Sequence, residues 1–163
     1  MSNSQLRRVA SFITAAGILL SPALVYGQGF AVTGGANVNP DQVFAGGRYE
    51  WPLMENVWFQ PGADAGFGDG VKLFAVNFDV TVRKALDRSP WMVYAGGGPA
   101  LNHYRWENAR ENQLGMNVLG GLRHSSGVFT EFRAGLADGP AFRFTVGYML
   151  GNSTGSHRPR RSR

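Results

Sequence analysis

The feature that most constrains this chain is the alternation of apolar and polar residues in short segments. Every second residue from 142 to 150 is apolar or aromatic, and residues 74 to 82 repeat the pattern with Phe74, Val76, Phe78, Val80 and Val82. Successive side chains of a β-strand point to opposite faces, so this period of two predicts strands with one apolar face. No stretch of the chain between residues 28 and 150 has the apolar spacing of a long amphipathic helix.

Eight such segments fill residues 28–150, and the turns between them are rich in Gly, Pro, Asn, Asp and Ser. We expect strands at Phe30–Val38, Gln42–Trp51, Val57–Phe67, Val71–Arg83, Trp91–Asn102, Leu114–Arg123, Val128–Leu136 and Ala141–Leu150. Short connections pair each strand with the next in antiparallel fashion, which predicts an all-β up-and-down barrel or a sandwich. The longest connection expected, at residues 103–113, runs from His103 to Gln113.

The first 27 residues have the three parts of a secretory signal peptide. Arg7 and Arg8 precede an apolar run at Val9–Leu20, and Val25-Tyr26-Gly27 offers small residues for cleavage before Gln28. The sequence therefore predicts export, a barrel domain at 28–150 and a basic, disordered tail at 151–163.

Charge and composition exclude several classes of function. The chain has no cysteine, and six of its 16 Lys/Arg residues lie near its two ends, so ten basic residues in the body face 11 acidic ones. A nucleic-acid-binding domain needs its positive charge on the folded face that meets phosphate, and this chain lacks such a face. None of the three histidines has metal-ligand spacing to another, so we expect no metal site. We likewise expect no cofactor and no nucleic acid partner.

The polar face of the predicted strands carries Arg together with Asp and Glu, whereas Lys is absent from it. Arg and carboxylate suit enclosed, bidentate contacts, and the glycines interleaved with them would let a narrow barrel close around long side chains. We therefore expect a polar network inside the barrel formed by Arg48, Glu50, Asp64, Asp79, Arg83, Glu131, Arg133 and Arg143.

Aromatic residues with a polar atom gather at the ends of the predicted strands. Indole and phenol groups prefer the headgroup depth of a bilayer, and strands of about 9–11 residues suffice to cross it. We expect an outward aromatic girdle formed by Trp51, Trp58, Trp91 and Tyr148 near the end that holds both termini, and by Tyr104 and Trp106 at the other.

With these features, residues 29–150 resemble the small eight-stranded outer-membrane β-barrel proteins of Gram-negative bacteria, the OmpA-like and OmpX-like barrel superfamily. The resemblance rests on the signal peptide, the hairpin layout and the alternating closing strand Phe142–Leu150. The chain departs from the family by ending that strand in Leu150 rather than Phe and by continuing for 13 residues. The resemblance implies a transmembrane barrel with a lumen filled by side chains, surrounded by outer-membrane lipid and lipopolysaccharide and inserted by the barrel-assembly machinery.

Three functions remain open from the sequence. The first is a non-enzymatic outer-membrane barrel with a structural or surface-interaction role. The second is a lipid A-modifying hydrolase that uses His124, Ser125 or Ser126 and Glu131, although no oxyanion donor lies nearby in the sequence. The third is a soluble periplasmic barrel like a lipocalin, whose apolar face would point inward around a small ligand.

Overall fold

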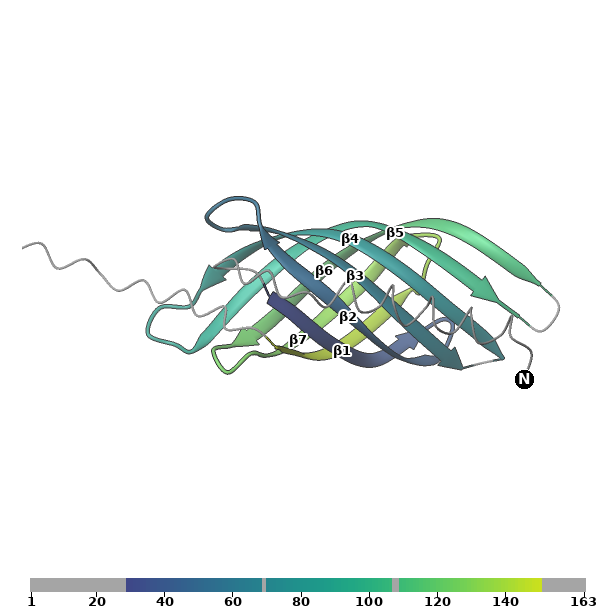
Figure 1. Cartoon of the computed structure of the whole chain (residues 1–163), viewed down its shortest axis with the longest axis horizontal. Helices are drawn as coiled ribbons and strands as arrows, with labels where there is room; N and C mark the ends of the chain where they lie inside the picture. Colours follow the sequence, from purple (N-terminus) through teal and green to yellow (C-terminus); the bar gives the residue numbers. More distant parts are fainter. Residues whose placement is uncertain (1–28, 69, 107–108, 151–163) are drawn as a thin grey trace, which may run out of the picture.

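The chain folds into a closed antiparallel barrel of eight strands (Figure 1). The computed structural model describes residues 29–68, 70–106 and 109–150. The strands are β1 (Gly29–Val38), β2 (Gln42–Pro52), β3 (Val57–Gly68), β4 (Val71–Ala85), β5 (Trp91–Arg105), β6 (Arg110–His124), β7 (Val128–Ala137) and β8 (Phe142–Met149). Each pairs with the next, and β1 pairs with β8 from Ala31↔Met149 to Val38↔Phe142. The predicted up-and-down barrel is confirmed, and the closing pair excludes the sandwich.

The two ends of the barrel are named here by the position of the chain termini. We call the end where β1 begins and β8 ends the termini end, on the left in Figure 1, and the opposite end the loop end. No helix among the described residues is long and apolar enough to cross a membrane. The predicted signal peptide at 1–27 and tail at 151–163 lie outside the described residues.

The expected long connection at His103–Gln113 is wrong. Strand β5 continues to Arg105 and β6 begins at Arg110, so the two strands are longer than predicted and only four residues join them. Their polar residues suggested a loop, but the alternation persists, with Tyr104 buried inside and Arg105 exposed outside. The resulting β5–β6 hairpin reaches beyond the other strands at the loop end (Figure 1).

The apolar side chains of the strands lie on the outer face of the barrel. Phe74 of β4 and Phe144 of β8 are 51% and 52% exposed, whereas Asp79 and Glu131, on the inward faces of β4 and β7, are each 2% exposed. A water-soluble barrel would have the reverse arrangement, because apolar area is stable only when it is removed from water. The outward apolar face therefore excludes the lipocalin-like alternative.

The height of the apolar band can be estimated along β4. Its outward face begins with Lys72 and ends with Lys84, and the five outward residues between them are Phe74, Val76, Phe78, Val80 and Val82. Twelve residues of extended strand cover about 40 Å, and a tilt of about 35–45° reduces this to about 30 Å along the barrel axis. This height matches the hydrocarbon thickness of a bilayer, about 30 Å, so the two lysines bracket a membrane-spanning band.

A cation placed within this band tests the membrane assignment. Val80→Arg puts a guanidinium on the outward face of β4 and is expected to lower the free energy of unfolding by about 2–4 kcal/mol in phospholipid vesicles. Urea unfolding followed by tryptophan fluorescence measures the loss. Lys84→Arg, at the edge of the same face, should leave the midpoint unchanged, and equal stability of the two variants would contradict a lipid-facing wall.

Candidate functional site

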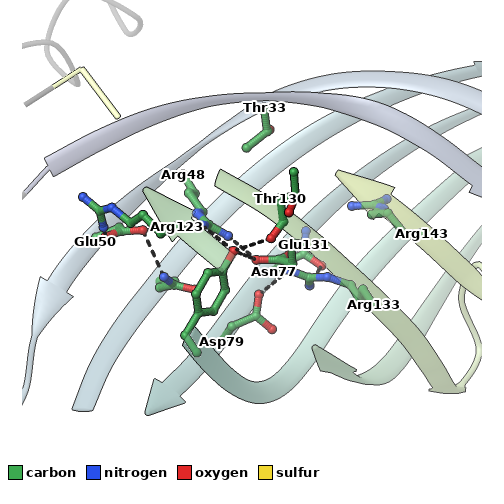
Figure 2. Close-up of polar contacts among 12 residues, drawn as sticks. Thr33, Arg48, Glu50, Asn77, Asp79, Arg123, Thr130, Glu131, Arg133 and Arg143 are labelled. Atoms are coloured by element: carbon green, nitrogen blue, oxygen red, sulfur yellow. Dashed lines mark hydrogen bonds and ion pairs between the residues drawn. The ribbon is translucent and has the colours of Figure 1, made fainter. Parts of the chain in front are cut away.

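The inward faces of six strands bring nine charged residues into the lumen. We call this set the lumen network, and its members are Arg48, Glu50, Asp64, Asp79, Arg83, Arg123, Glu131, Arg133 and Arg143. Eight of them are the residues expected from the polar face, and the structure places all eight inside the barrel. Arg123 belongs to the same face and joins them. The contacts group these residues into three tiers along the barrel axis, and Figure 2 shows part of the network around Arg48, Glu131 and Arg133.

The tier nearest the termini end is centred on Glu50 of β2. Its carboxylate lies 2.8 Å from the guanidinium groups of both Arg83 and Arg123 and 3.5 Å from that of Arg48. The side-chain amide of Gln60 donates a further hydrogen bond of 3.1 Å to it. Glu50 is 1% exposed, so a single buried carboxylate holds arginines from three different strands.

The middle tier is centred on Glu131 of β7. One carboxylate oxygen accepts hydrogen bonds from Arg48 and from the Tyr94 hydroxyl, and the other accepts one from Arg133. Arg133 also reaches across the lumen to Asp79, with 2.8 Å between their nearest atoms. Arg48 contacts both Glu131 and Glu50, so it connects this tier to the first.

The tier nearest the loop end pairs Asp64 of β3 with Arg143 of β8 at 2.6 Å. The Arg143 Nε donates to the side-chain oxygen of Asn37 at 2.8 Å. Asn77 connects this tier to the middle one, because its amide nitrogen donates to Asp64 and its oxygen accepts from Arg133. The three tiers therefore form one continuous network.

Aromatic rings support three of the guanidinium groups. The Arg48 carbon Cζ lies 4.1 Å from the Phe129 ring centroid, that of Arg83 lies 4.2 Å from the Trp58 ring, and that of Arg143 lies 4.4 Å from the Phe44 ring. These distances fall well within the range of cation–π contacts, which gain strength when they are desolvated.

Apolar clusters lie at both ends of the lumen. Ala31, Phe129 and Met149 pack together at the termini end. The loop-end cluster consists of Val71, Leu73, Ala75 and Tyr104, with Trp106 packed against it. Two cavities, both lined by Asn77 and Arg133, offer about 20 Å³ each, which is room for about one water molecule. The described lumen is therefore packed rather than open.

Only three of the six residues predicted for the aromatic girdle lie on the outer face. Trp51, Trp91 and Tyr148 are exposed on the outer face near the termini end. The assignment of Trp58 to the girdle is wrong, because it pairs with the inward residue Thr81 and its ring lies against Arg83.

The loop-end part of the girdle is also wrong. Tyr104 is buried in the lumen, and Trp106 stacks on it with 5.7 Å between ring centroids. Tyr104 has the inward parity of Tyr94 on the same strand, so its ring fills the barrel instead of facing lipid.

The candidate catalytic residues of the hydrolase alternative do not come together. The Nδ1 atom of His124 lies 2.9 Å from the Ser126 hydroxyl and accepts a hydrogen bond from the Ser126 amide, a local turn geometry. The His124 ring lies against outward Trp91, whereas Glu131 is inside the barrel and held by arginines. Among the described residues there is also no cluster of three His, Cys, Asp or Glu side chains suited to a metal ion.

Several lumen residues escaped the sequence analysis, mainly because they are aromatic or neutral. Phe44 and Phe129 have the inward parity of Arg48 and Glu131 on their own strands, and this parity was the signal that could have placed them. Tyr94 and Asn77 likewise follow the alternation of their strands. Which arginine meets which carboxylate depends on the heights of the strands, which alternation does not encode.

Comparison with known proteins identifies the fold. No protein-family model matches the chain, and no curated protein matches it either. Among solved structures, the N-terminal β-barrel domain of Pseudomonas aeruginosa OprF matches with a TM-score of 0.61 and 13% identity, over 76% of this chain and 96% of that one. Neisserial surface protein A matches with a TM-score of 0.59 and 12% identity, over 75% and 93%. This chain shares their fold. At these identities the likeness extends to the barrel architecture and not to individual side chains.

Replacing Glu50, the centre of the tier nearest the termini end, should destabilise the barrel strongly. Glu50→Gln leaves the guanidinium groups of Arg83 and Arg123 without their closest carboxylate, and loss of one partner of a buried ion pair costs about 3–5 kcal/mol. Urea unfolding of the refolded barrel measures the change. Glu111→Gln, which alters an exposed carboxylate on β6, serves as the control, and equal midpoints for the two variants would contradict the role of Glu50.

Filling the space opposite a lumen ring should also destabilise the barrel. A Cβ atom at Gly147 would lie 2.1 Å from the Phe129 ring, which itself packs under Arg48. Gly147→Ala is therefore expected to cost about 1–3 kcal/mol, the usual range for overpacking. Gly120→Ala is the matched control, because the nearest atom to its Cβ would be 3.9 Å away on the outer side. Thermal unfolding that affects both variants alike would argue against a tightly packed lumen.

Proposed function

We propose that this protein is a non-enzymatic integral barrel of the bacterial outer membrane with a structural role, and that its lumen conducts no solute. The observation that carries this proposal is the inverted arrangement of the wall. Apolar side chains cover a band about 30 Å tall on the outside, while five arginines and four carboxylates pair with one another inside, between two apolar clusters.

The solved structures that share the fold support the location. Both are outer-membrane barrels with eight strands, and a predicted signal peptide would deliver this chain across the inner membrane to the same compartment. The termini end would then face the periplasm and the loop end the cell surface, as in outer-membrane barrels generally.

The short connections favour a structural role over adhesion. By the strand bounds, no connection at the loop end exceeds four residues, and among the described strands β5 and β6 project past their neighbours there. Such turns offer little area for a specific complex, which buries about 800 Å² on each partner. The absence of an assembled triad around His124 supports a role without catalysis.

Membrane fractionation and unboiled gel electrophoresis test the location. We expect the protein in the outer-membrane fraction, and we expect a folded species that resists dodecyl sulfate until it is boiled. A chain that remains soluble after removal of detergent would overturn the proposal. Release of fatty acid from lipid A by the purified barrel, abolished by Ser126→Ala, would overturn the non-enzymatic assignment.

The closed lumen makes a separate prediction about permeability. Vesicles containing the refolded protein should exclude arabinose in a swelling assay, at the rate of protein-free vesicles, because the cavities of about 20 Å³ hold no sugar. A porin reconstituted in parallel provides the positive control. Entry of arabinose in proportion to the amount of barrel would contradict a packed lumen.

A further inference from the structure

The outer face of the wall carries very few charges, and their distribution is uneven. Among the described strands, the outward charged residues are Lys72, Lys84, Arg105 and Arg110, all of them basic. Lys84 stands alone at the termini end, where it pairs with Val93. The other three lie together at the loop end.

The register places these three residues in one row. Lys72 of β4 pairs with Arg105 of β5, and Arg105 pairs with Arg110 of β6. Directly paired residues have Cβ atoms about 4.5–5.5 Å apart, and like charges in such positions repel each other. We call Lys72, Arg105 and Arg110 the basic row. A second strand neighbour, Phe67, pairs with Lys72 and supplies no compensating charge.

The next rows toward the membrane centre change from polar to apolar. Phe74, His103 and Asn112 form the first of them, and a hydrogen-bond contact of 2.6 Å joins His103 Nδ1 to Asn112 Oδ1. Below it, Leu101 and Leu114 are exposed on the outside. The basic row therefore lies at one boundary between headgroups and hydrocarbon, and Lys84 lies at the opposite boundary.

We propose that the basic row is a binding site for the phosphate groups of a bisphosphorylated glycolipid of the lipid A type, in the leaflet that surrounds the loop end. Three cations spaced across two interstrand gaps cover about 10 Å, which suits a headgroup with more than one phosphate. Guanidinium groups bind phosphate with two parallel hydrogen bonds, and an ammonium adds a point charge. The acyl chains of the lipid would lie against Leu101 and Leu114.

This inference deepens the proposed function and rests on it, since the row meets lipid only if the wall spans a membrane. It also accounts for the lack of an outward aromatic girdle at this end among the described residues. Where Trp51, Trp91 and Tyr148 line the termini end, the outward positions of β4, β5 and β6 at the loop end carry the basic row instead.

Lipid titration of the folded barrel tests the site. Native mass spectrometry of the protein in a non-ionic detergent measures binding of bisphosphorylated lipid A and of its dephosphorylated form. We expect saturable binding that requires the phosphates and weakens about 100-fold in the variant Lys72→Gln/Arg105→Gln/Arg110→Gln, on the basis of the attraction of single basic residues to anionic lipid. Arg105→Gln alone, at the centre of the row, should weaken it about fivefold, and Lys84→Gln should leave it unchanged.

The outcomes separate this inference from the proposed function. Equal affinity of the triple variant and the unmodified barrel overturns the inference, as does equal competition by phosphatidylglycerol or by inorganic phosphate. Gel mobility before and after boiling shows whether each variant is folded, and if the triple variant does not fold, Arg105→Gln decides the matter. A barrel that inserts stably but ignores lipid A refutes the site alone, whereas a chain that does not insert refutes the proposed function.

Discussion

The hydrogen-bonded pairing of β1 with β8 is the constraint on which the rest of this structure depends. It leaves no strand with an unpaired edge, so the backbone can lie in hydrocarbon without exposing amide and carbonyl groups. Closure at eight strands also sets the diameter of the lumen, which is then just wide enough for side chains. Everything on the inward face must fit that space and satisfy its own polar atoms there.

The lumen fills this space with long arginines set beside small residues. Gly147 leaves room for the Phe129 ring, and the Arg48 guanidinium lies over that ring. The carboxylates then meet the arginines from the opposite wall, as Glu131 meets Arg48. Burying ions is costly, and an ion pair compensates for that cost only when its hydrogen-bond geometry is good. Stability of this interior therefore depends on the packing of rings and glycines as much as on charge.

Much of this arrangement could be predicted from the sequence, because a period of two identifies both strands and faces. The alternation around Asp79 and Arg143 assigns these residues to the polar face without any knowledge of the fold. Position along the barrel was harder to predict. Trp58 and Tyr104 lie at strand ends and have the composition of a girdle, but their parity with Gln60 and Tyr94 turns them inward. The polar residues at His103–Gln113 suggested a loop, because residue propensities do not show that a strand can continue to the edge of the membrane-spanning band.

The three tiers have a consequence for how the barrel comes together. The ion pairs that cross the lumen join residues far apart in the chain. Arg48 and Glu131 are separated by 83 positions, Asp64 and Arg143 by 79, and Asp79 and Arg133 by 54. The later partner in each of these ion pairs belongs to β7 or β8, the last strands to be synthesised. Until these two strands are in place, Arg48, Asp64 and Asp79 lack these counterions. An incomplete sheet is therefore unstable in the bilayer. Insertion and sealing should accordingly occur as a single concerted event.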